Sequence, residues 1–302
     1  MTKPNLFIIG SAKCGTTTLY SYLQKSKEIF FSIQKEPHYF LREVHDLKYQ
    51  GPDDDFFFEK YPKTLTEYEK LFSDAKGYAW VGEASTMYMY YSQVAQKLFD
   101  YNPEAKIIGI VRNPIQRAYS HYLHHVREQT VSAPSFYDAL KEELGGKRDS
   151  WAPQRKFIDM SMYGRQLQAY FDLFPRDQIL ILKFEDLMKN PNEFLGKVSE
   201  FLGVENVFQD IKVDKHNASG VPKFGMLHTV YIKSLRFMRR TFPFLTHSPL
   251  SKIRKKFDNY YRNLFLSKPK MDQKSADLLK PVFRKDIMQL EKLTGLDLKD
   301  WY

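Results

Sequence analysis

Short apolar runs alternate with helix-like stretches along the first two hundred residues, a rhythm typical of a parallel α/β sheet. Buried strands are predicted at residues 5–10, 29–33, 78–82, 106–111 and 178–184. Apolar residues at helical spacing predict helices at residues 16–25, 92–101, 114–128, 163–174 and 194–202. The pattern therefore predicts an α/β protein with a mainly parallel sheet.

Two stretches interrupt this rhythm. Residues 46–64 are acidic and aromatic without a clear period, which indicates a surface excursion, and residues 205–225 read as a polar loop. A chain of 302 residues with 43% hydrophobic residues can bury one large core. We therefore predict a single domain over residues 1–302, with a nucleotide-binding core at 1–222 and a basic helical region at 223–302.

The charge of the chain is uneven. The net charge is +10, yet residues 223–302 hold 18 basic and 7 acidic side chains, so residues 1–222 are nearly neutral. Within 223–262 there are 10 basic residues and one acidic residue, interleaved with aromatic ones. This stretch suits either a helical cap over an acceptor site or a peripheral membrane-binding patch, and we favour the cap. We expect no nucleic-acid binding, because no matching motif accompanies the charge.

Cysteine usage and apolar runs bear on the cellular location. Cys14 is the only cysteine, which excludes an intrachain disulfide and any multi-cysteine metal site. The apolar runs at residues 6–9, 107–111 and 179–182 are far below the roughly 20 residues that span a bilayer. We expect a reduced, cytoplasmic protein.

The strongest chemical signal is Gly-Ser-Ala-Lys-Cys-Gly-Thr-Thr-Thr at residues 10–18, between the first strand and the first helix. Two glycines five apart let the backbone wrap so that several N–H groups converge on one anion. The helix adds its positive N-terminal end, Lys13 adds a charge, and the threonines add hydroxyl donors. The loop predicts a phosphate-type site.

The loop departs from the general P-loop pattern in one respect. Thr16 stands where the pattern has a lysine after the second glycine, and the lysine lies inside the loop at position 13. In ATP and GTP users that lysine and the next hydroxyl handle the terminal phosphates and magnesium. A metal-dependent kinase is therefore an alternative that this loop argues against, and a non-catalytic anion- or membrane-binding scaffold is another.

Ala-Lys-Cys-Gly-Thr-Thr-Thr-Leu at residues 12–19 resembles the 5′-phosphosulfate loop of the sulfotransferases that use 3′-phosphoadenosine 5′-phosphosulfate (PAPS). The resemblance implies a P-loop-like, three-layer fold with a central parallel sheet flanked by helices. It also implies PAPS as donor, 3′-phosphoadenosine 5′-phosphate (PAP) as product, and no metal. The donor-binding residues that it indicates here are Ser11, Ala12, Lys13, Cys14, Gly15, Thr16, Thr17 and Thr18.

A second match concerns the 3′-phosphate of the donor. The family places an Arg at the end of a central strand and a Ser eight residues later, and here Arg112 and Ser120 have that spacing. An Arg offers a planar fork of donors that suits phosphate oxygens. Residues 216–223 resemble the family's late loop over the donor, which adds Gly220 and Lys223. Residues 163–187 and 283–301 resemble its later helix–strand unit and its ending.

The segment Gln-Lys-Glu-Pro-His-Tyr-Phe at residues 34–40 resembles the heparan-sulfate-type and bacterial branch. There a glutamate next to the acceptor acts as base, which implies Glu36 as the base here, with His38 as the alternative. Lys13 would stabilise the leaving phosphate oxygen. Lys35 is a further candidate for substrate contact.

The segment at 82–88 resembles one near the family's acceptor site and adds Glu83 and Ser85 as candidates for substrate contact, although Glu83 could instead brace the strand end. Thr86 replaces the proline usual there. The resemblance implies transfer to a hydroxyl or amine of a carbohydrate or other small molecule. His121, His124 and His125 share one helix, but we expect no metal site there, because no carboxylate or cysteine partner is evident.

Overall fold

The computed structural model describes residues 2–32, 34–42, 44, 49–51, 61–131, 133–205, 221–222, 230, 234, 266–267 and 269–302. In this part of the chain a five-stranded parallel sheet has the order β2-β3-β1-β4-β5. Its strands are β1 (Leu6–Gly10), β2 (Ile29–Phe31), β3 (Trp80–Ala84), β4 (Lys106–Val111) and β5 (Ile179–Lys183). The predicted α/β fold with a central parallel sheet is confirmed.

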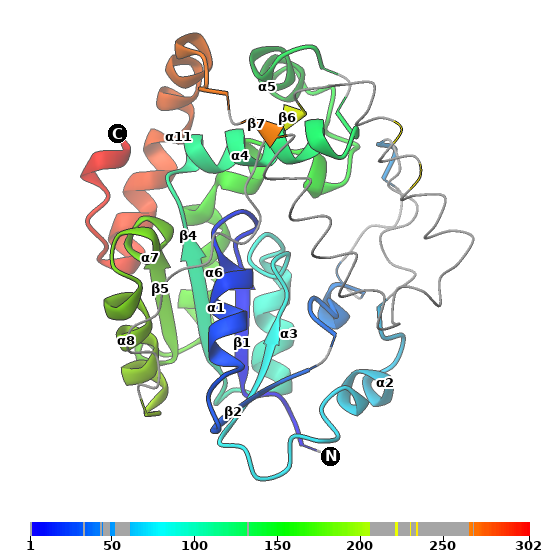
Figure 1. Cartoon of the computed structure of the whole chain (residues 1–302), viewed down its shortest axis with the longest axis vertical. Coiled ribbons are helices and arrows are strands. Elements are labelled where there is room, and N and C mark those ends of the chain that lie inside the picture. Colours follow the sequence, from blue (N-terminus) through cyan, green and yellow to red (C-terminus); the bar gives the residue numbers. More distant parts are fainter. Residues whose placement is uncertain are drawn as a thin grey trace.

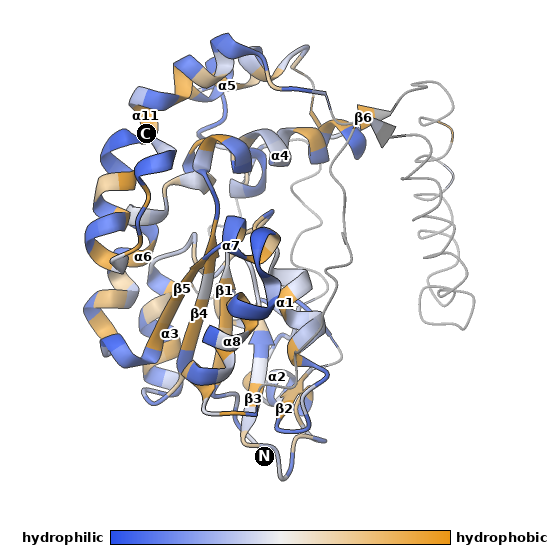
Figure 2. Ribbon diagram, turned by 60° about the vertical axis from the view of Figure 1, so that its left-hand side comes forward, coloured by the Kyte–Doolittle hydropathy of each residue, from blue (hydrophilic) through white to orange (hydrophobic). Residues whose placement is uncertain are grey.

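Helices cover both faces of this sheet (Figures 1 and 2). The helices α3, α6 and α11 pack together on one face, whereas α1, α7 and α8 lie on the other. The helices α4 and α5 lie beyond the carboxyl ends of the strands, at the top of Figure 1. The bounds are α1 (Thr16–Leu23), α2 (Leu65–Lys70), α3 (Gln93–Tyr101), α4 (Pro114–Arg127), α5 (Phe136–Leu144), α6 (Tyr163–Leu173), α7 (Phe184–Lys189), α8 (Pro191–Leu202) and α11 (Gln273–Thr294).

The centre of the core is the pair β1 and β4. All five residues of β1 are buried, as are the last five of β4, because helices cover both faces of these strands. This is why both strands read as continuous apolar runs in the sequence. The two strands place the residues that follow them, the loop after Gly10 and Arg112, next to each other at the carboxyl edge of the sheet.

Several element boundaries differ from the sequence prediction. The strand β3 runs over Trp80–Ala84, two residues later than predicted, which includes Glu83 in the strand. The helix α8 begins at Pro191, three residues early, because the Asn190 side chain caps it by accepting from the Glu193 amide. The short helices α2 and α5 were not predicted, although each starts at a capping hydroxyl, Thr64 or Ser135.

The carboxyl-terminal helix α11 belongs to the core. Its first residue after the Asp272 cap is Gln273, ten residues before Phe283, where the resemblance to the family's ending began. The helix packs against α6 and α4. A short antiparallel pair, β6 (Val221–Pro222) and β7 (Leu266–Ser267), joins the chain on either side of the basic stretch. Apart from Val230 and Ser234, residues 223–262 lie outside the described part, so the acceptor-site cap stays a prediction.

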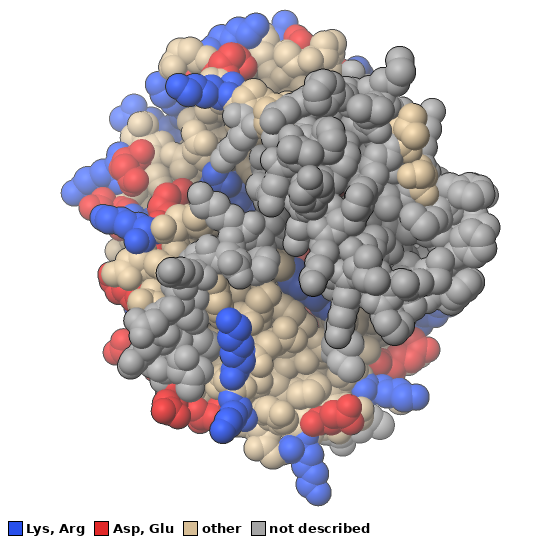
Figure 3. Space-filling model, viewed as in Figure 1, with Lys and Arg blue, Asp and Glu red and all other residues tan. Residues whose placement is uncertain are grey.

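None of the helices in the described part of the chain is long and apolar enough to cross a membrane. On the face shown in Figure 3, Lys and Arg side chains alternate with Asp and Glu along the left edge of the described surface. This edge is formed by α11, α7 and α8 (Figure 1), and residues 1–222 as a whole are nearly neutral in charge. Any anion recognition by the core must therefore come from local groups rather than from a broad positive field.

Candidate functional site

The donor loop, residues 10–16, turns tightly between β1 and α1. Lys13 and Gly15 have positive φ angles of 72° and 90°, and Gly15 occupies the cap position of α1. No side chain among the described residues hydrogen-bonds to the first amides of that helix from the cap position. The first amides of a helix lack partners within the helix, so the start of α1 next to this loop is suited to an anion.

The side chains of the predicted donor-binding residues divide into two groups. The side chains of Ser11, Cys14, Thr16 and Thr18 are buried in the core, whereas Ala12, Lys13 and Thr17 are half-buried. Cys14 contacts the Tyr163 hydroxyl at 3.7 Å, and burial raises the pKa of its thiol to about 11. The thiol is therefore neutral at physiological pH, and Cys14 can offer an anion only its backbone.

Arg112 lies beside the donor loop. Its Nη1 atom is 3.5 Å from the carbonyl oxygen of Lys13, and its guanidinium group lies 4.7 Å above the ring of Phe184. These contacts hold the planar fork of donors at the edge of the loop. The structure thus brings together the two parts of the donor site that the sequence predicted separately.

Ser120 lies in the second turn of α4 and is buried, with 4% of its surface exposed. The helix begins directly after Arg112, at a cap in which the Asn113 side chain accepts from the Gln116 amide. The separation of eight residues between Arg112 and Ser120 therefore reflects the end of β4, the capped start of α4 and two turns of that helix. The contact of Ser120 with a 3′-phosphate stays a prediction.

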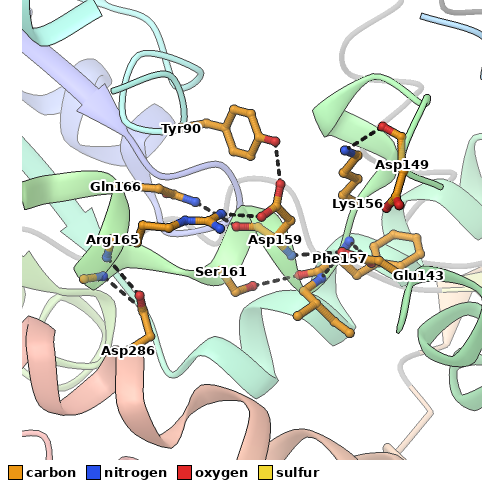
Figure 4. A network of polar contacts seen from close by, with 12 residues as sticks. Tyr90, Glu143, Asp149, Lys156, Phe157, Asp159, Ser161, Arg165, Gln166 and Asp286 are labelled. Atoms are coloured by element: carbon orange, nitrogen blue, oxygen red, sulfur yellow. Dashed lines mark hydrogen bonds and ion pairs between the residues drawn. The ribbon is translucent and has the colours of Figure 1, made fainter. Parts of the chain in front are cut away.

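A buried arginine anchors α4. Arg117 is completely buried and donates to the Ser161 hydroxyl at 2.6 Å and to the Phe157 carbonyl at 2.8 Å. The segment that binds Arg117 is itself held in place, since Glu143 accepts hydrogen bonds from the three amides of residues 157–159 (Figure 4). Asp286 of α11 accepts from the first amides of α6. The polar network fixes the helix that carries Ser120.

Two histidines of α4 form a buried pair. The Nε2 atoms of His121 and His125 are 3.1 Å apart. Burial lowers the pKa of both rings, helped by the positive charge of Arg117 at His121 and of Arg155 at His125, where the pKa falls to about 3. Both rings are neutral at physiological pH. In the described ranges no cluster of three or more His, Cys, Asp or Glu residues could hold a metal ion.

The base segment, residues 34–41, follows β2 and contains Glu36. The Glu36 amide donates to the carbonyl of Ala84 at 3.0 Å, which attaches the segment to the end of β3. The Glu36 carboxylate is 2.8 Å from Lys35 Nζ, 3.8 Å from His38 Nε2 and 3.4 Å from the Thr86 hydroxyl. The side chain keeps 39% of its surface exposed, so it remains accessible.

The pKa of Glu36 reflects two opposing influences. Partial burial raises it, but the hydrogen bonds and positive charge from His38 and Lys35 outweigh burial and lower the pKa to about 2. Glu36 is therefore ionised throughout the physiological range and can accept a proton. Lys35, predicted to contact substrate, instead lies against the carboxylate as its ion-pair partner, and its contact with substrate stays a prediction.

His38 lies behind Glu36. Only 2% of its surface is exposed, and its ring packs edge-on against Tyr61 at 5.0 Å and Tyr88 at 6.0 Å. Its Nε2 atom faces the Glu36 carboxylate. This arrangement suits a residue that orients Glu36 better than one that reaches an acceptor itself.

Glu83 and Ser85 are more deeply buried than substrate-binding residues usually are. Their exposed fractions are 1% and 0%, and the Ser85 hydroxyl donates to Glu83 at 2.5 Å. Burial raises the pKa of Glu83 to about 7, although hydrogen bonds from Ser85, Tyr68 and Tyr88 oppose the rise. Substrate contact by either residue stays a prediction, and their positions favour a supporting role behind the base segment.

Two tyrosines in this region were not predicted from the sequence. Tyr68 of α2 donates to Glu83, and Tyr88 accepts from the Phe40 amide at 3.2 Å. The signal available was only the high number of tyrosines, which does not say which hydroxyls meet. Gly220 and Lys223, predicted to close over the donor, lie outside the described residues.

Fold and site together define an α/β protein with a glycine-containing loop and a helix start after its first strand and an ionised carboxylate after its second. A family model described as the sulfotransferase domain matches residues 3–274. The chain therefore belongs to the sulfotransferase family.

Individual relatives agree with this assignment. The chain is 26% identical to mouse carbohydrate sulfotransferase 15 (Mus musculus) over 253 residues, covering 67% of this chain and 44% of the relative. It is 26% identical to human heparan sulfate glucosamine 3-O-sulfotransferase 6 (Homo sapiens) over 208 residues, covering 68% and 54%. The chain thus spans about half the length of the curated relatives it matches.

Among solved structures, a sulfotransferase from Alicyclobacillus acidocaldarius superimposes with a TM-score of 0.76 and 27% identity. The match covers 100% of this chain and 99% of that one. The likeness therefore extends over the whole bacterial protein, whereas it covers only part of the longer animal relatives.

Proposed function

We propose that this protein transfers a sulfuryl group from PAPS to a hydroxyl or amine of a carbohydrate or other small acceptor. The relatives named for carbohydrate and for heparan sulfate glucosamine support a sugar acceptor. The departure of the donor loop from the metal-dependent P-loop pattern supports a donor other than magnesium triphosphate.

In this proposal the donor loop holds the 5′-phosphosulfate end of PAPS. The amides at the start of α1 and the hydroxyls of Thr16 and Thr17 bind the 5′-phosphate, while Lys13 faces the oxygen that becomes the leaving group. Arg112 and Ser120 bind the 3′-phosphate, and Gly220 and Lys223 close over the donor. The position of Arg112 against the Lys13 carbonyl supports a single continuous donor site.

Glu36 acts as the base at the other end of the reaction. The acceptor oxygen or nitrogen forms a bond to sulfur, the bond between sulfur and the bridging phosphate oxygen breaks, and PAP leaves. An acceptor oxygen becomes strongly acidic as it bonds to sulfur. A carboxylate with a pKa of about 2 can therefore take the proton during bond formation rather than before it. His38 and Lys35 keep Glu36 ionised and oriented.

The single observation that carries the proposal is the position of Thr86 between the donor loop and Glu36. Gly10 approaches this residue so closely that an added Cβ would lie 3.0 Å from the Thr86 carbonyl oxygen. The Thr86 hydroxyl is 3.4 Å from a carboxylate oxygen of Glu36. One residue thus touches the start of the donor loop and the base, which supports donor and base serving one reaction.

A thermal-shift comparison tests the proposal. A ligand at 100 times its Kd stabilises the folded protein by about 2.7 kcal/mol, so PAP should raise the melting temperature without metal. ATP with magnesium is the control. A rise with ATP and magnesium but not with PAP would support a kinase and contradict the proposal. Transfer of label from [35S]PAPS to a panel of amino-sugar oligosaccharides and simple alcohols then identifies the acceptor.

Three further expectations concern the surroundings of the enzyme. We infer that residues 223–262 cover the acceptor, with a peripheral membrane contact as the alternative for the same basic stretch. Catalysis would need no metal. A cytoplasmic location remains an expectation from the single cysteine and the short apolar runs.

A further inference from the structure

Glu83 is a buried carboxylate near the end of β3, the strand that lies between β2 and β1 in the sheet. It accepts hydrogen bonds from three hydroxyl groups, those of Tyr68, Ser85 and Tyr88. Such a group is costly to bury unless it is well hydrogen-bonded. The three donors offset part of this cost, although burial still raises the pKa of Glu83 to about 7.

Two of these hydroxyls, those of Ser85 and Tyr88, also form hydrogen bonds with the base segment. The Ser85 hydroxyl accepts from the His38 amide at 3.1 Å, and the Tyr88 hydroxyl accepts from the Phe40 amide at 3.2 Å. A hydroxyl has one proton to donate. When that proton points at Glu83, the lone pairs of the oxygen face the amides of the base segment. Glu83 therefore sets the direction of both hydrogen bonds.

The backbone of the base segment needs this support. Glu36 and His38 have positive φ angles of 59° and 50°, and neither residue is glycine. Such conformations persist only where the surroundings hold them in place. The holding contacts come from the end of β3 and the residues after it, through the Ala84 carbonyl, the Ser85 hydroxyl and the Tyr88 hydroxyl.

We propose that Glu83 is a positioning residue for the base, acting through the Ser85 and Tyr88 hydroxyls on the backbone that carries Glu36. The inference rests on the proposed function, because it assumes that Glu36 is the base. Tyr68 has a different place in the same network, since its hydroxyl donates to Glu83 without bonding to the base segment in the contacts described above.

Burial makes the charge of Glu83 sensitive to pH near neutrality. Besides Ser85, the groups that face this carboxyl group are tyrosines from four elements: Tyr68 of α2, Tyr88 of the turn after β3, Tyr101 of α3 and Tyr170 of α6. His38 lies one step away, with its ring against Tyr88. Proton uptake by Glu83 turns an acceptor into a donor, which forces one hydroxyl to turn its proton away.

The test compares two variants that each remove one hydroxyl from Glu83. Ser85→Ala removes a hydroxyl that also bonds to the base segment, whereas Tyr68→Phe removes one that does not. The readout is the carboxyl signal of Glu36 in protein labelled with [5-13C]glutamate, assigned with Glu36→Gln and followed against pH. In the wild-type protein this signal should show no titration of Glu36 itself above pH 4, because the pKa of Glu36 is about 2, and any small step near pH 7 would report proton uptake by Glu83.

Ser85→Ala should release the base segment from its place beside Lys35 and His38, so that the Glu36 signal titrates near the ordinary glutamate pKa of about 4.3. Tyr68→Phe should leave it constant. With an acceptor in hand, Ser85→Ala should lower kcat by about 10- to 100-fold, as for a misplaced catalytic group, with little change in acceptor KM. A role in substrate binding would instead raise KM.

Two outcomes would overturn the inference: a constant Glu36 signal in Ser85→Ala, or an equal change in Tyr68→Phe. If Ser85→Ala does not fold, Tyr88→Phe replaces it and is interpreted in the same way. Glu83→Gln should also shift the Glu36 signal, because an amide cannot accept from all three hydroxyls as the carboxylate does. The signal is measured without donor or acceptor, so a failure of sulfuryl transfer itself would be seen separately, in the PAP and [35S]PAPS experiments.

Discussion

The donor loop combines local turn features with anchors at Ile110 and Arg112, whereas the base segment is held by side chains 47 and 48 residues further along the chain. The loop needs a glycine with positive φ and a helix start, and both lie within residues 10–16. The base segment instead depends on Ser85 and Tyr88, which reach it only after β2 and β3 have paired. The local features of the donor loop can be predicted from sequence, whereas the distant contacts that hold the base segment cannot.

The two regions also differ in charge. The donor loop gathers Lys13 and Arg112 at a helix start, a positive site suited to an anion. The base segment keeps a carboxylate ionised with one lysine and one histidine. The comparison therefore predicts that variants of one region affect donor binding and variants of the other affect turnover.

The largest effect is expected for Glu36→Gln. Removing a general base costs on the order of 10²- to 10⁴-fold in kcat, and the amide keeps the size of the side chain. Turnover is measured with [35S]PAPS at saturating donor. A variant with nearly normal turnover would remove Glu36 as the base and leave His38, the alternative, in its place.

Lys13→Ala should lower kcat by about 10²- to 10³-fold, as for the loss of one group that stabilises the developing charge. Unlike Glu36→Gln, it should also weaken the binding of PAP, because the lysine faces the donor in both ground and transition states. Calorimetry and steady-state kinetics on the same preparation separate the two effects. Unchanged PAP affinity together with normal kcat would place Lys13 outside the site.

Arg112→Ala and Ser120→Ala test the 3′-phosphate site. Arg112→Ala should weaken PAP binding by about 1.5–3 kcal/mol, as for a charge-assisted hydrogen bond, and Ser120→Ala by about 0.5–1.5 kcal/mol. Adenosine 5′-phosphate, which lacks the 3′-phosphate, is the matched control ligand and should lose little affinity. Equal losses for both nucleotides would mean that Arg112 supports the loop structurally instead of binding the 3′-phosphate.

A further effect concerns the dependence of stability on pH at Glu83. Its pKa in the folded protein, about 7, is above the ordinary value of 4.5, so the folded state holds the proton more tightly than the unfolded state between these values. The free energy of unfolding contributed by Glu83 is therefore greatest below pH 4.5 and falls as pH rises to about 7.

Glu83→Gln removes this dependence. The stability of the variant relative to wild type should rise by about 1–3 kcal/mol between pH 4.5 and 7, measured by urea unfolding at a series of pH values. The contribution of Glu36 to stability has the opposite dependence on pH, because its folded pKa of about 2 lies below the ordinary value of 4.5. That contribution is lost only in acid. A difference between variant and wild type that does not change with pH would contradict the raised pKa of Glu83.

The same contrast explains which parts of the fold could be predicted. The strands β1 and β4 are apolar along their whole length because both faces are covered, so the sequence pattern identified them. The start of β3 could not be placed, because Trp80 is only half-buried and the polar residue Glu83 lies inside the strand. The helices α2 and α5 are short, and their caps at Thr64 and Ser135 are weak signals in a single sequence.

Within the candidate site, local motifs in the sequence predicted Lys13, Arg112, Ser120 and Glu36, and their roles stay predictions. The sequence did not identify Arg117, whose burial among Ser161 and Phe157 depends on contacts some 40 residues away. Nor did it identify Tyr68 and Tyr88, because a phenol hydroxyl that meets a buried carboxylate looks in sequence like any other tyrosine.

The most direct test of this division between the two regions is the Kd of PAP for Glu36→Gln, measured by isothermal titration calorimetry beside the wild-type protein. The account predicts Kd values that agree within about twofold, less than 0.5 kcal/mol, while turnover of the same preparation falls by about 10²-fold or more. A loss of PAP affinity as large as the loss of turnover would show that Glu36 serves the donor site, and would contradict the account.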